Sequence, residues 1–343
     1  MNKVLVTGAT GLIGYPIVCA LLKEGRRVKA LVRSPEKARP ILPEDCELVS
    51  GDVTDLNSIA RAMEDCVTVY HTAGIHEQWL PNPDLFYQVN TQGTRNMTLA
   101  ALQKNIEKFI YISTVDIFSA PRGHSYDETM LDPEPKKTAY GGSKQQADRI
   151  VAAACEKGLA AAFIHPAAVY GPAPAGSLWF MEFIRNIKQK KIPLVPPGAL
   201  PLVYSEDLAA GCLLAEKKAG DGERFILSES CISFEQMAHV VSEELSIRKF
   251  PTVMPLWLAR FLAITGETIS EFTGKPPLLY RGQLELLQLQ TKPVSDKAKH
   301  ILGWNPISFQ EGVKRTIAYL KETAAATADT YEPALAGKEE SKS

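Results

Sequence analysis

The stretch Thr7-Gly8-Ala9-Thr10-Gly11-Leu12-Ile13-Gly14 decides the fold. It follows a short apolar run at residues 3–7 and leads into a segment with helical spacing near residues 12–24. Glycines at this spacing permit a tight turn and let an anionic group approach backbone N–H groups at a helix N-terminus, where the helix dipole favours negative charge. A strand, a glycine turn and a helix in this order predict a site for the pyrophosphate of a dinucleotide.

Apolar segments of strand length alternate with amphipathic segments of helix length as far as about residue 171. Continuous apolar strands are typical of a parallel sheet that is covered by helices on both faces. We therefore expect an α/β fold with a doubly wound parallel sheet, a Rossmann core, at residues 1–171, to which some later segments return.

The pattern becomes less regular after this point, with the proline-rich segments GPAPAG and IPLVPPGALP and helices near 177–190, 233–246 and 308–322. We expect residues 172–322 to form mainly a smaller lobe beside the carboxyl ends of the strands, where open α/β sheets bind ligands. Residues 323–343 are small, polar and charged, and predict a disordered tail.

Composition argues against several function classes. Lys and Arg together number 38 and Asp and Glu 39, so there is no electrostatic footprint for nucleic acid. The six cysteines contain no CxxC pair and the histidines no metal-ligand spacing, so we expect reduced thiols and no metal site. The first residues enter a strand pattern at once, which predicts a cytoplasmic protein. The apolar segment 253–266 is too short to span a membrane and contains Arg260, so we expect a lobe helix without membrane contact.

The end of the second predicted strand bears on the choice of cofactor. The sequence there is Leu31-Val32-Arg33-Ser34-Pro35, with Lys37 close behind and no acid before Glu36. A guanidinium binds a 2′-phosphate bidentately, whereas a carboxylate would repel it. We therefore expect Arg33 and Lys37 to favour NADP(H), with NAD(H) as the alternative if Arg33 is only a solvated surface residue.

The stretch TAYGGSK, residues 138–144, places Tyr140 and Lys144 on one face of a predicted helix. A free phenol has a pKa near ~10, and a neighbouring ammonium and an oxidised nicotinamide would both favour the phenolate. The spacing predicts a proton shuttle for general acid–base catalysis. Ser113 and Thr114 end another predicted strand on the ligand side, and Asp116 beyond them would bind a substrate group or make a local hydrogen bond.

These motifs resemble the extended branch of the short-chain dehydrogenase/reductase superfamily, the NAD-dependent epimerase/dehydratase family, over roughly residues 1–320. The segments GDVTD, HTAG, VNTQGTRNM, HPAAVYGP and SDKAKHILGWNP follow the glycine motif in the family's order. The resemblance implies cofactor contacts at the following residues: Gly8, Thr10, Gly11, Leu12, Ile13, Gly14, Asp52, Val53, Ala73, Gly74, Asn90, Ser113, Tyr140, Lys144, Pro166 and Val169.

The same resemblance assigns the chemistry. Thr114 aligns best with the family's catalytic hydroxyl, because it immediately precedes a short segment that ends in an aromatic residue, and Ser113 is the second choice. Tyr140 would exchange the proton of the substrate oxygen while hydride passes between C4 of the nicotinamide and a substrate carbon. Lys144 would hold the nicotinamide ribose. His165 stands where family members often carry Arg or Asn, so its role stays open.

The substrate class also follows from the resemblance. Members that act on nucleotide sugars carry arginines for the diphosphate, but this chain has Ala199-Leu200-Pro201 and Leu289-Gln290-Thr291-Lys292 at those places. It is most similar to the dihydroflavonol-reductase and 3β-hydroxysteroid-dehydrogenase-like group. This implies interconversion of a ketone or aldehyde and an alcohol on a small hydrophobic or aromatic substrate.

Two alternatives stay open at this point. The stretch EQWLPNPDLFYQVN also resembles hopanoid-associated sugar epimerases, and a protein could read NADP(H) on this fold without catalysis. We further expect a homodimer through the helices near 84–104 and 137–157, as in the family. Apolar side chains of the lobe are expected mainly in its core: Leu178, Trp179, Phe180, Met181, Phe183, Leu256, Trp257, Phe261 and Leu262.

Overall fold

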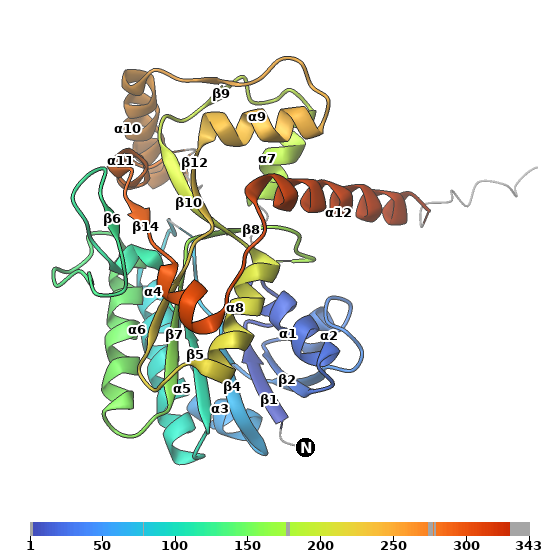
Figure 1. Cartoon of the computed structure of the whole chain (residues 1–343), viewed down its shortest axis with the longest axis vertical. Helices are drawn as coiled ribbons and strands as arrows, with labels where there is room; N and C mark the ends of the chain where they lie inside the picture. The colour runs from blue at the N-terminus through green and yellow to red at the C-terminus, as the bar shows by residue number, and fades with distance from the viewer. Residues whose placement is uncertain (1–2, 78, 176–178, 274–276, 278, 330–343) are drawn as a thin grey trace, which may run out of the picture.

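A seven-stranded parallel sheet forms the centre of the protein (Figure 1). The computed structural model describes residues 3–77, 79–175, 179–273, 277 and 279–329. The strand order is β11-β7-β5-β4-β1-β2-β3, and every neighbouring pair is parallel. The strands are β1 (Lys3–Thr7), β2 (Arg27–Val32), β3 (Glu47–Ser50), β4 (Cys66–His71), β5 (Lys108–Ile112), β7 (Ala161–Pro166) and β11 (Arg224–Leu227). This is the doubly wound order, which confirms the expected fold class.

Alternate residues of each strand face opposite layers of helices. On β1, Val4 and Val6 pack with α1 (Gly14–Lys23), α8 (Ser205–Lys218) and the π-helix η3 (Ala298–Leu302), with α2 (Pro35–Ala38) at the edge of this layer. Leu5 between them faces α3 (Leu56–Ala62), α5 (Gly93–Gln103) and α6 (Ala139–Cys155). Both faces of the sheet are therefore buried, which explains why the strands are apolar throughout.

A smaller lobe lies beyond the carboxyl ends of the strands (Figure 1). Its three-stranded sheet of β8 (Ala168–Tyr170), β10 (Ala199–Tyr204) and β12 (Ser230–Ser233) packs with α7 (Trp179–Lys188), α9 (Phe234–Glu244) and α12 (Phe309–Asp329). The remaining elements are the parallel pair β9 (Leu194–Val195) and β13 (Thr252–Val253), the helices α10 (Leu256–Thr273) and α11 (Arg281–Leu289), and the parallel pair β6 (Ser125–Tyr126) and β14 (Lys292–Pro293). The lobe closes over the edge of the sheet where the site residues gather.

Two helices differ from the sequence-based expectation. The helix near 84–104 is divided into α4 (Asp84–Phe86), a π-helical turn η1 (Tyr87–Gln92) that contains the buried Asn90, and α5. Helix α12 runs on to Asp329, into the segment that we expected to be disordered, because its Ala-rich sequence has high helix propensity. The rest of that segment, residues 330–343, lies outside the described residues.

The apolar residues of the lobe do not all lie in its core. Phe180 and Met181 are buried, as expected. In contrast, Trp257 and Phe261 on α10 are 70% and 58% exposed, so the expectation of core packing is wrong for both. Leu178 lies outside the described residues. Within the described chain, no helix is long and apolar enough to cross a bilayer.

Candidate active site

The glycine turn after β1 brings three segments of backbone into close contact. Gly8 has φ +65°, and a Cβ at this position would lie 2.8 Å from the backbone nitrogen of Ala73. A Cβ on Gly14 would lie 2.3 Å from the Gly8 carbonyl oxygen. These contacts allow no side chain at either position.

The N-terminus of α1 is suited to an anion. Its first turn has no acidic residue and no side-chain cap, so the helix dipole favours negative charge there. Leu12 and Ile13 pack their side chains into apolar clusters. Only their backbone can therefore face a ligand, together with Gly11 and the half-buried Thr10. The residues at this turn fit the pyrophosphate of a dinucleotide.

The neighbouring strand ends carry the groups expected at the adenosine half. Arg33 and Lys37 are exposed after β2, and the Glu36 carboxylate between them accepts a hydrogen bond from Ser34. Asp52, after β3, accepts hydrogen bonds from the N–H and the hydroxyl of Thr54, both at 2.8 Å and both through Oδ1. Its other carboxylate oxygen is thus available to a ribose or a base. Val53 is buried and packs directly against Gly93, with 2.9 Å between its Cγ2 and a Cβ built on that glycine. This packing supports the turn after β3.

The side-chain amide of Asn90 is hydrogen-bonded within the protein through both its oxygen and its nitrogen. Its Oδ1 accepts a hydrogen bond from the Ile75 N–H at 2.7 Å, and its Nδ2 donates to the Ile75 carbonyl and to the Ser143 hydroxyl. Gly74 lies against this amide, with 3.1 Å between a built Cβ and Asn90 Oδ1. Asn90 therefore joins the loop after β4 to α6 and positions Ala73 and Gly74. A direct contact with nicotinamide stays a prediction.

Ser113 and Thr114 point their hydroxyls to different places. The Ser113 hydroxyl is buried and donates to the Asp148 carboxylate at 2.9 Å. Thr114 caps the short 3-10 helix η2 (Val115–Ile117): its Oγ1 accepts from the Asp116 N–H at 3.2 Å, and its hydroxyl also interacts with the Tyr140 phenol. Of the two hydroxyls, the one of Thr114 is thus the group beside the tyrosine.

Tyr140 and Lys144 lie in the first turns of α6, which begins where the Thr138 side chain caps the Gly141 N–H. The Lys144 Nζ donates to the Ile112 carbonyl at 2.7 Å and lies 4.8 Å from the centre of the Tyr111 ring. The Tyr140 ring is half-buried and contacts the edge of Phe86. The carboxyl end of β5 and the start of α6 therefore bring the hydroxyl, the phenol and the ammonium together.

The electrostatics of the site differ from our expectation. Burial raises the pKa of Tyr140 above its ordinary value, the Asp116 carboxylate raises it further, and Thr114 opposes the shift. Burial also lowers the pKa of Lys144 to about 8, while the Asp148 carboxylate opposes this. The expected lowering of the tyrosine pKa is therefore absent in the protein alone, because desolvation and the Asp116 carboxylate outweigh the Thr114 hydroxyl. The phenol is protonated at neutral pH and can donate a proton.

Asp116 lies on the same side of the site as these groups. Burial raises the pKa of its carboxyl, whereas Lys136 and the Thr114 hydroxyl oppose the shift. Its own N–H makes the local hydrogen bond to Thr114. A local hydrogen bond was one of our two expectations, and Asp116 makes one through its backbone N–H. Binding of substrate by its carboxyl stays a prediction.

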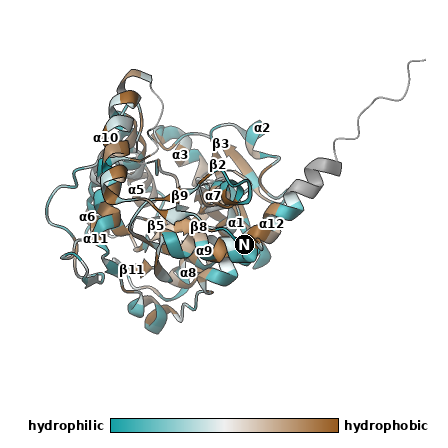
Figure 2. Ribbon diagram, turned by 90° about the horizontal axis from the view of Figure 1, so that it is seen from above, coloured by the Kyte–Doolittle hydropathy of each residue, from teal (hydrophilic) through white to brown (hydrophobic). Residues whose placement is uncertain are grey.

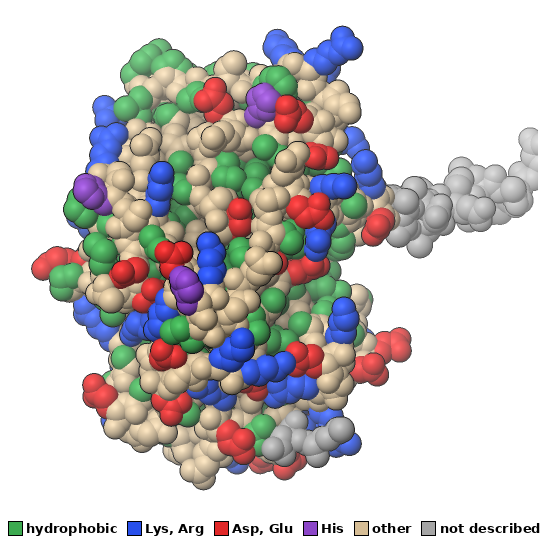
Figure 3. Space-filling view, viewed as in Figure 1, with side chains coloured by type: hydrophobic (Ala, Val, Ile, Leu, Met, Phe, Trp, Pro, Cys, Tyr) green, Lys and Arg blue, Asp and Glu red, His purple; other side chains and the backbone are tan. Residues whose placement is uncertain are grey.

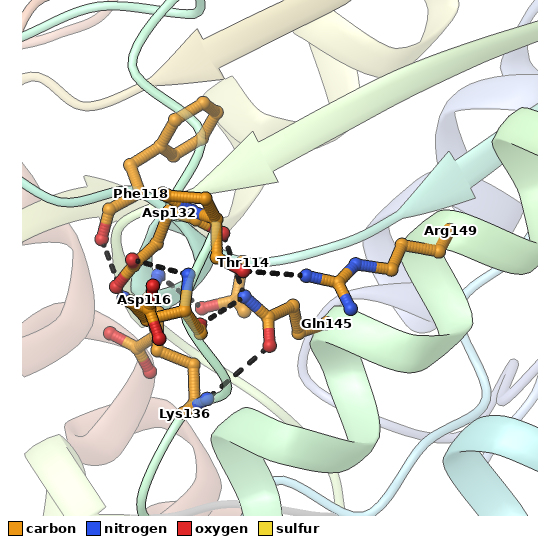
Figure 4. Close-up of polar contacts among 9 residues, drawn as sticks. Thr114, Asp116, Phe118, Asp132, Lys136, Gln145 and Arg149 are labelled. Atoms are coloured by element: carbon orange, nitrogen blue, oxygen red, sulfur yellow. Dashed lines mark hydrogen bonds and ion pairs between the residues drawn. The ribbon is translucent and has the colours of Figure 1, made fainter.

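A loop at residues 132–136 lies against the segment after Thr114 and against α6 (Figure 4). Lys136 donates to the Phe118 carbonyl at 2.8 Å and to the Asp132 carboxylate at 2.6 Å. Gln145 of α6 donates to the carbonyls of Asp132 and Glu134. The loop therefore links the segment after Thr114 to the helix that carries Tyr140.

A buried polar network that the sequence did not reveal runs behind Thr114 and Lys144. Asp148 is one helical turn beyond Lys144, and its carboxylate pairs with Arg224 of β11 at 2.7 Å. Arg224 donates to His165 Nε2 at 3.3 Å, and His165 Nδ1 donates to the Thr114 carbonyl at 3.3 Å. Burial and the Arg224 charge lower the pKa of His165 well below its ordinary value, so the ring is neutral. His165, whose role was open, thus connects an ion pair to the backbone of Thr114.

Part of this buried polar network could have been predicted from the sequence. Lys144 and Asp148 are four residues apart, which on a helix brings them to one face. No sequence signal points to Arg224, because only the pairing of β11 with β7 in the sheet brings it to the site. At the end of β7, Pro166 pairs with Leu227, and the Val169 carbonyl in β8 accepts from the Trp179 indole at 2.9 Å. Both lie at the carboxyl edge of the sheet, where the resemblance expects the nicotinamide.

The fold and the site together define an NAD(P)-dependent oxidoreductase: a Rossmann sheet with a glycine turn and a threonine, tyrosine and lysine at its carboxyl edge. The chain belongs to the NAD dependent epimerase/dehydratase family, whose family model matches residues 4–227.

Similar proteins extend over nearly the whole chain. A protein named putative dihydroflavonol 4-reductase from Synechocystis is 26% identical, covering 92% of this chain and 94% of its own. Sterol demethylase protein B from Methylococcus capsulatus is 25% identical, covering 93% and 98%. A third relative, named 4-hydroxy-2-methyl-3-oxo-4-farnesyl-3,4-dihydroquinoline-1-oxide ketoreductase, from Stigmatella aurantiaca, is 24% identical, covering 91% and 94%.

Solved structures share the fold. The crystal structure of gox2253 is 29% identical, with a TM-score of 0.80 and coverage of 94% of this chain and 99% of that one. The UDP-glucose 4-epimerase of Thermus thermophilus, solved with NAD, is 23% identical, with a TM-score of 0.73 and coverage of 93% and 99%. At this identity the epimerase supports the fold alone.

Proposed function

We propose that this protein is an NADP(H)-dependent oxidoreductase that interconverts a ketone or aldehyde and an alcohol on a small hydrophobic or aromatic molecule. The observation that carries the proposal is that the Thr114 hydroxyl lies beside the Tyr140 phenol, while Lys144, one turn further along α6, holds its ammonium at the carboxyl end of β5. Bound nicotinamide would supply or accept the hydride there. Each step below concerns what this chain's own residues would do.

In the direction of reduction, Tyr140 donates its proton to the carbonyl oxygen of the substrate. The raised pKa of the phenol keeps this proton in place at neutral pH. The Thr114 hydroxyl donates a second hydrogen bond to the same oxygen, so that charge developing there is stabilised by preorganised donors. Lys144, held by the Ile112 carbonyl, has two further N–H donors for the ribose hydroxyls.

The preference for NADP(H) rests on the ends of β2 and α2. Arg33 and Lys37 are exposed, and the described residues include no ion-pair partner for either. Glu36, the acid between them, is engaged by Ser34, and this hydrogen bond lowers its pKa. Two free cations favour a 2′-phosphate, and the sequence offers no carboxylate at the strand tip to bind a free ribose hydroxyl.

The substrate class follows from the relatives and from the missing diphosphate cations. Three relatives are named for a flavonoid reductase, a sterol enzyme and a farnesylated ketone reductase. At the places where nucleotide-sugar enzymes carry arginines, this chain has Ala199-Leu200-Pro201 and Leu289-Gln290-Thr291-Lys292. A buried diphosphate would lack donors there, whereas a neutral hydrophobic substrate needs none.

The experiment is a screen of hydrophobic and aromatic ketones, monitored by NADPH absorbance with NADH in parallel. We expect turnover that Tyr140→Phe abolishes while NADPH binding is retained, because the phenol acts on substrate rather than on cofactor. Tyr70→Phe is the matched control and should stay active, because the Tyr70 hydroxyl donates to Glu216 on the α8 side of the sheet, away from α6. Activity of Tyr140→Phe near that of the wild type would overturn the mechanism.

The same preparation separates the two alternatives. An epimerase recycles a tightly held cofactor, so NAD(H) retained through purification, with no net NADPH consumption, would favour the sugar epimerase. Binding of NADPH without turnover of any carbonyl compound would favour the sensing protein.

We further propose a cytoplasmic homodimer that associates through α5 and α6, where Leu99 is 42% exposed. Light scattering of Leu99→Asp, which should become monomeric, tests that interface.

A further inference from the structure

Helix α10 turns an apolar face toward solvent. Trp257, Phe261 and Ile264 follow the spacing i, i+4, i+7 and are 70%, 58% and 52% exposed. Val253 of β13 and Leu194 of β9 continue this surface and are each 37% exposed. We call these five residues the apolar face. It contrasts with the opposite side of the helix, where Ala259 and Ala263 are fully buried against Leu279 and Leu284.

Exposed cations lie on α7 and α10 and on the segments that lead into β9 and β13. Residues 183–204 and 246–266, which meet where β9 pairs with β13, contain no Asp or Glu, although the whole chain has a net charge of −1. Their cations are all exposed, and none forms an ion pair within the described chain: Arg185, Lys188, Lys190, Lys191, Arg248, Lys249 and Arg260. Lys and Arg side chains stand out along the upper rim of the molecule in the space-filling view (Figure 3), above the helices of the lobe. We call these cations the basic rim.

Helix α10 is connected to the active site through α11, on its side away from the apolar face. Helix α10 packs against α11, and both lie at the same corner of the molecule (Figures 1 and 2). Gly282 at the start of α11 approaches Thr138, with 3.6 Å between a built Cβ and the Thr138 methyl group. Thr138 caps the helix that carries Tyr140 two residues later. Helix α10 is thus linked through α11 to the start of the helix that carries Tyr140.

We propose that the apolar face and the basic rim dock on the surface of a lipid bilayer that contains anionic lipids. Tryptophan and phenylalanine insert at the boundary of headgroups and acyl chains, and cations around them bind anionic headgroups. The excess of exposed cations on these two segments disfavours docking of this face against a second copy of itself, because like charges would meet across the two-fold axis. The sequence alone led us to expect no membrane contact, because the segment is too short to span a bilayer and contains Arg260.

Docking would bring the active site to a source of hydrophobic substrate. This consequence rests on the proposed function, whereas the docking itself does not. A lipid-soluble ketone could pass from the bilayer to Tyr140 along α10 and α11 without crossing water. The contact is peripheral, because α10 lies on the bilayer surface rather than across it.

The experiment is co-sedimentation of the full chain with vesicles of phosphatidylcholine and phosphatidylglycerol, and with vesicles of phosphatidylcholine alone, without cofactor or substrate. We expect binding to the mixed vesicles that salt weakens, and a blue shift of Trp257 emission. Trp257→Ser/Phe261→Ser should lose about tenfold or more of the partition coefficient. Arg248→Ser/Lys249→Ser should lose about fivefold for each cation removed. Ile301→Ser, at an exposed apolar residue on η3, is the matched control and should bind like the wild type.

Three results would each overturn the proposal. The first is a wild-type protein that does not sediment with mixed vesicles. The second is unchanged binding of Trp257→Ser/Phe261→Ser. The third is light scattering that shows a dimer which this variant converts to a monomer, since a second copy would then cover the apolar face. Circular dichroism checks that each variant is folded, and vesicle binding is measured apart from turnover, so failure here is distinct from failure of the proposed activity.

Discussion

The ion pair between Asp148 and Arg224 should stabilise the site far more than a surface pair, and Arg224→Met tests this. The variant removes the guanidinium 2.7 Å from a carboxylate whose side chain is 4% exposed. Asp148 would keep only the Ser113 hydroxyl, 2.9 Å away, as a donor. Breaking a buried pair by removing one partner costs about 3–5 kcal/mol, because the remaining charge is buried without compensation. We expect a loss of this size in the free energy of unfolding at neutral pH.

The loss should depend on pH in a defined direction. Burial already raises the pKa of Asp148, and Arg224 opposes that shift, so removal of Arg224 raises the pKa further. A carboxyl whose pKa is higher in the folded than in the unfolded protein binds more protons when folded, so stability falls as pH rises between the two values. Arg224→Met should therefore be less destabilised at pH 5 than at pH 8.

Urea unfolding followed by circular dichroism at both pH values measures the effect. The matched control is Arg315→Met, which removes an exposed guanidinium paired with Glu311 at 2.8 Å and should cost no more than about 1 kcal/mol. The double variant Asp148→Asn/Arg224→Met should recover part of the loss, because no buried charge is left. A loss below about 1 kcal/mol for Arg224→Met, or an equal loss at both pH values, would refute the reasoning.

Three further predictions concern the cofactor and the chemistry. Arg33→Ser should raise the KM for NADPH about 10- to 100-fold with little change for NADH, since a charge-assisted hydrogen bond contributes about 1.5–3 kcal/mol. Arg27→Ser, at the opposite end of β2, is the control. Equal changes in KM for both cofactors would contradict the assignment of Arg33 to the 2′-phosphate. The kcat/KM for reduction should fall as pH rises through about 8, because Lys144 loses its proton there, and a profile that stays flat to high pH would exclude a role for the ammonium. Gly14→Ala should abolish NADPH binding or folding, since its Cβ would lie 2.3 Å from the Gly8 carbonyl oxygen. Gly220→Ala, where a Cβ would meet only ordinary contacts at 3.5 Å, is the control and should bind NADPH normally. Binding by Gly14→Ala, measured by fluorescence, would contradict the close approach.

Local sequence determined the Rossmann core and its glycine turn. Strands buried on both faces must be apolar throughout, and the backbone approach of Gly14 to Gly8 leaves room for glycine only, so both features are visible as composition and spacing. The pair Tyr140 and Lys144 was visible for the same reason, because helical periodicity alone places residues four apart on one face. The family resemblance added Thr114, which the structure places beside the phenol.

Only the tertiary structure decided the rest of the site. Arg224 is 76 residues from Asp148 in the chain, and the pairing of β11 with β7 brings them together. Desolvation, which depends on the surrounding chain, raises the pKa of Tyr140 where the neighbouring lysine alone predicted the opposite. Burial also decides the orientation of α10: its sequence is apolar on several sides, and only packing against Leu279 and Leu284 selects which side faces inward and leaves Trp257 in solvent. Periodicity is a property of neighbours along the chain, whereas desolvation and long-range pairing are properties of neighbours in space.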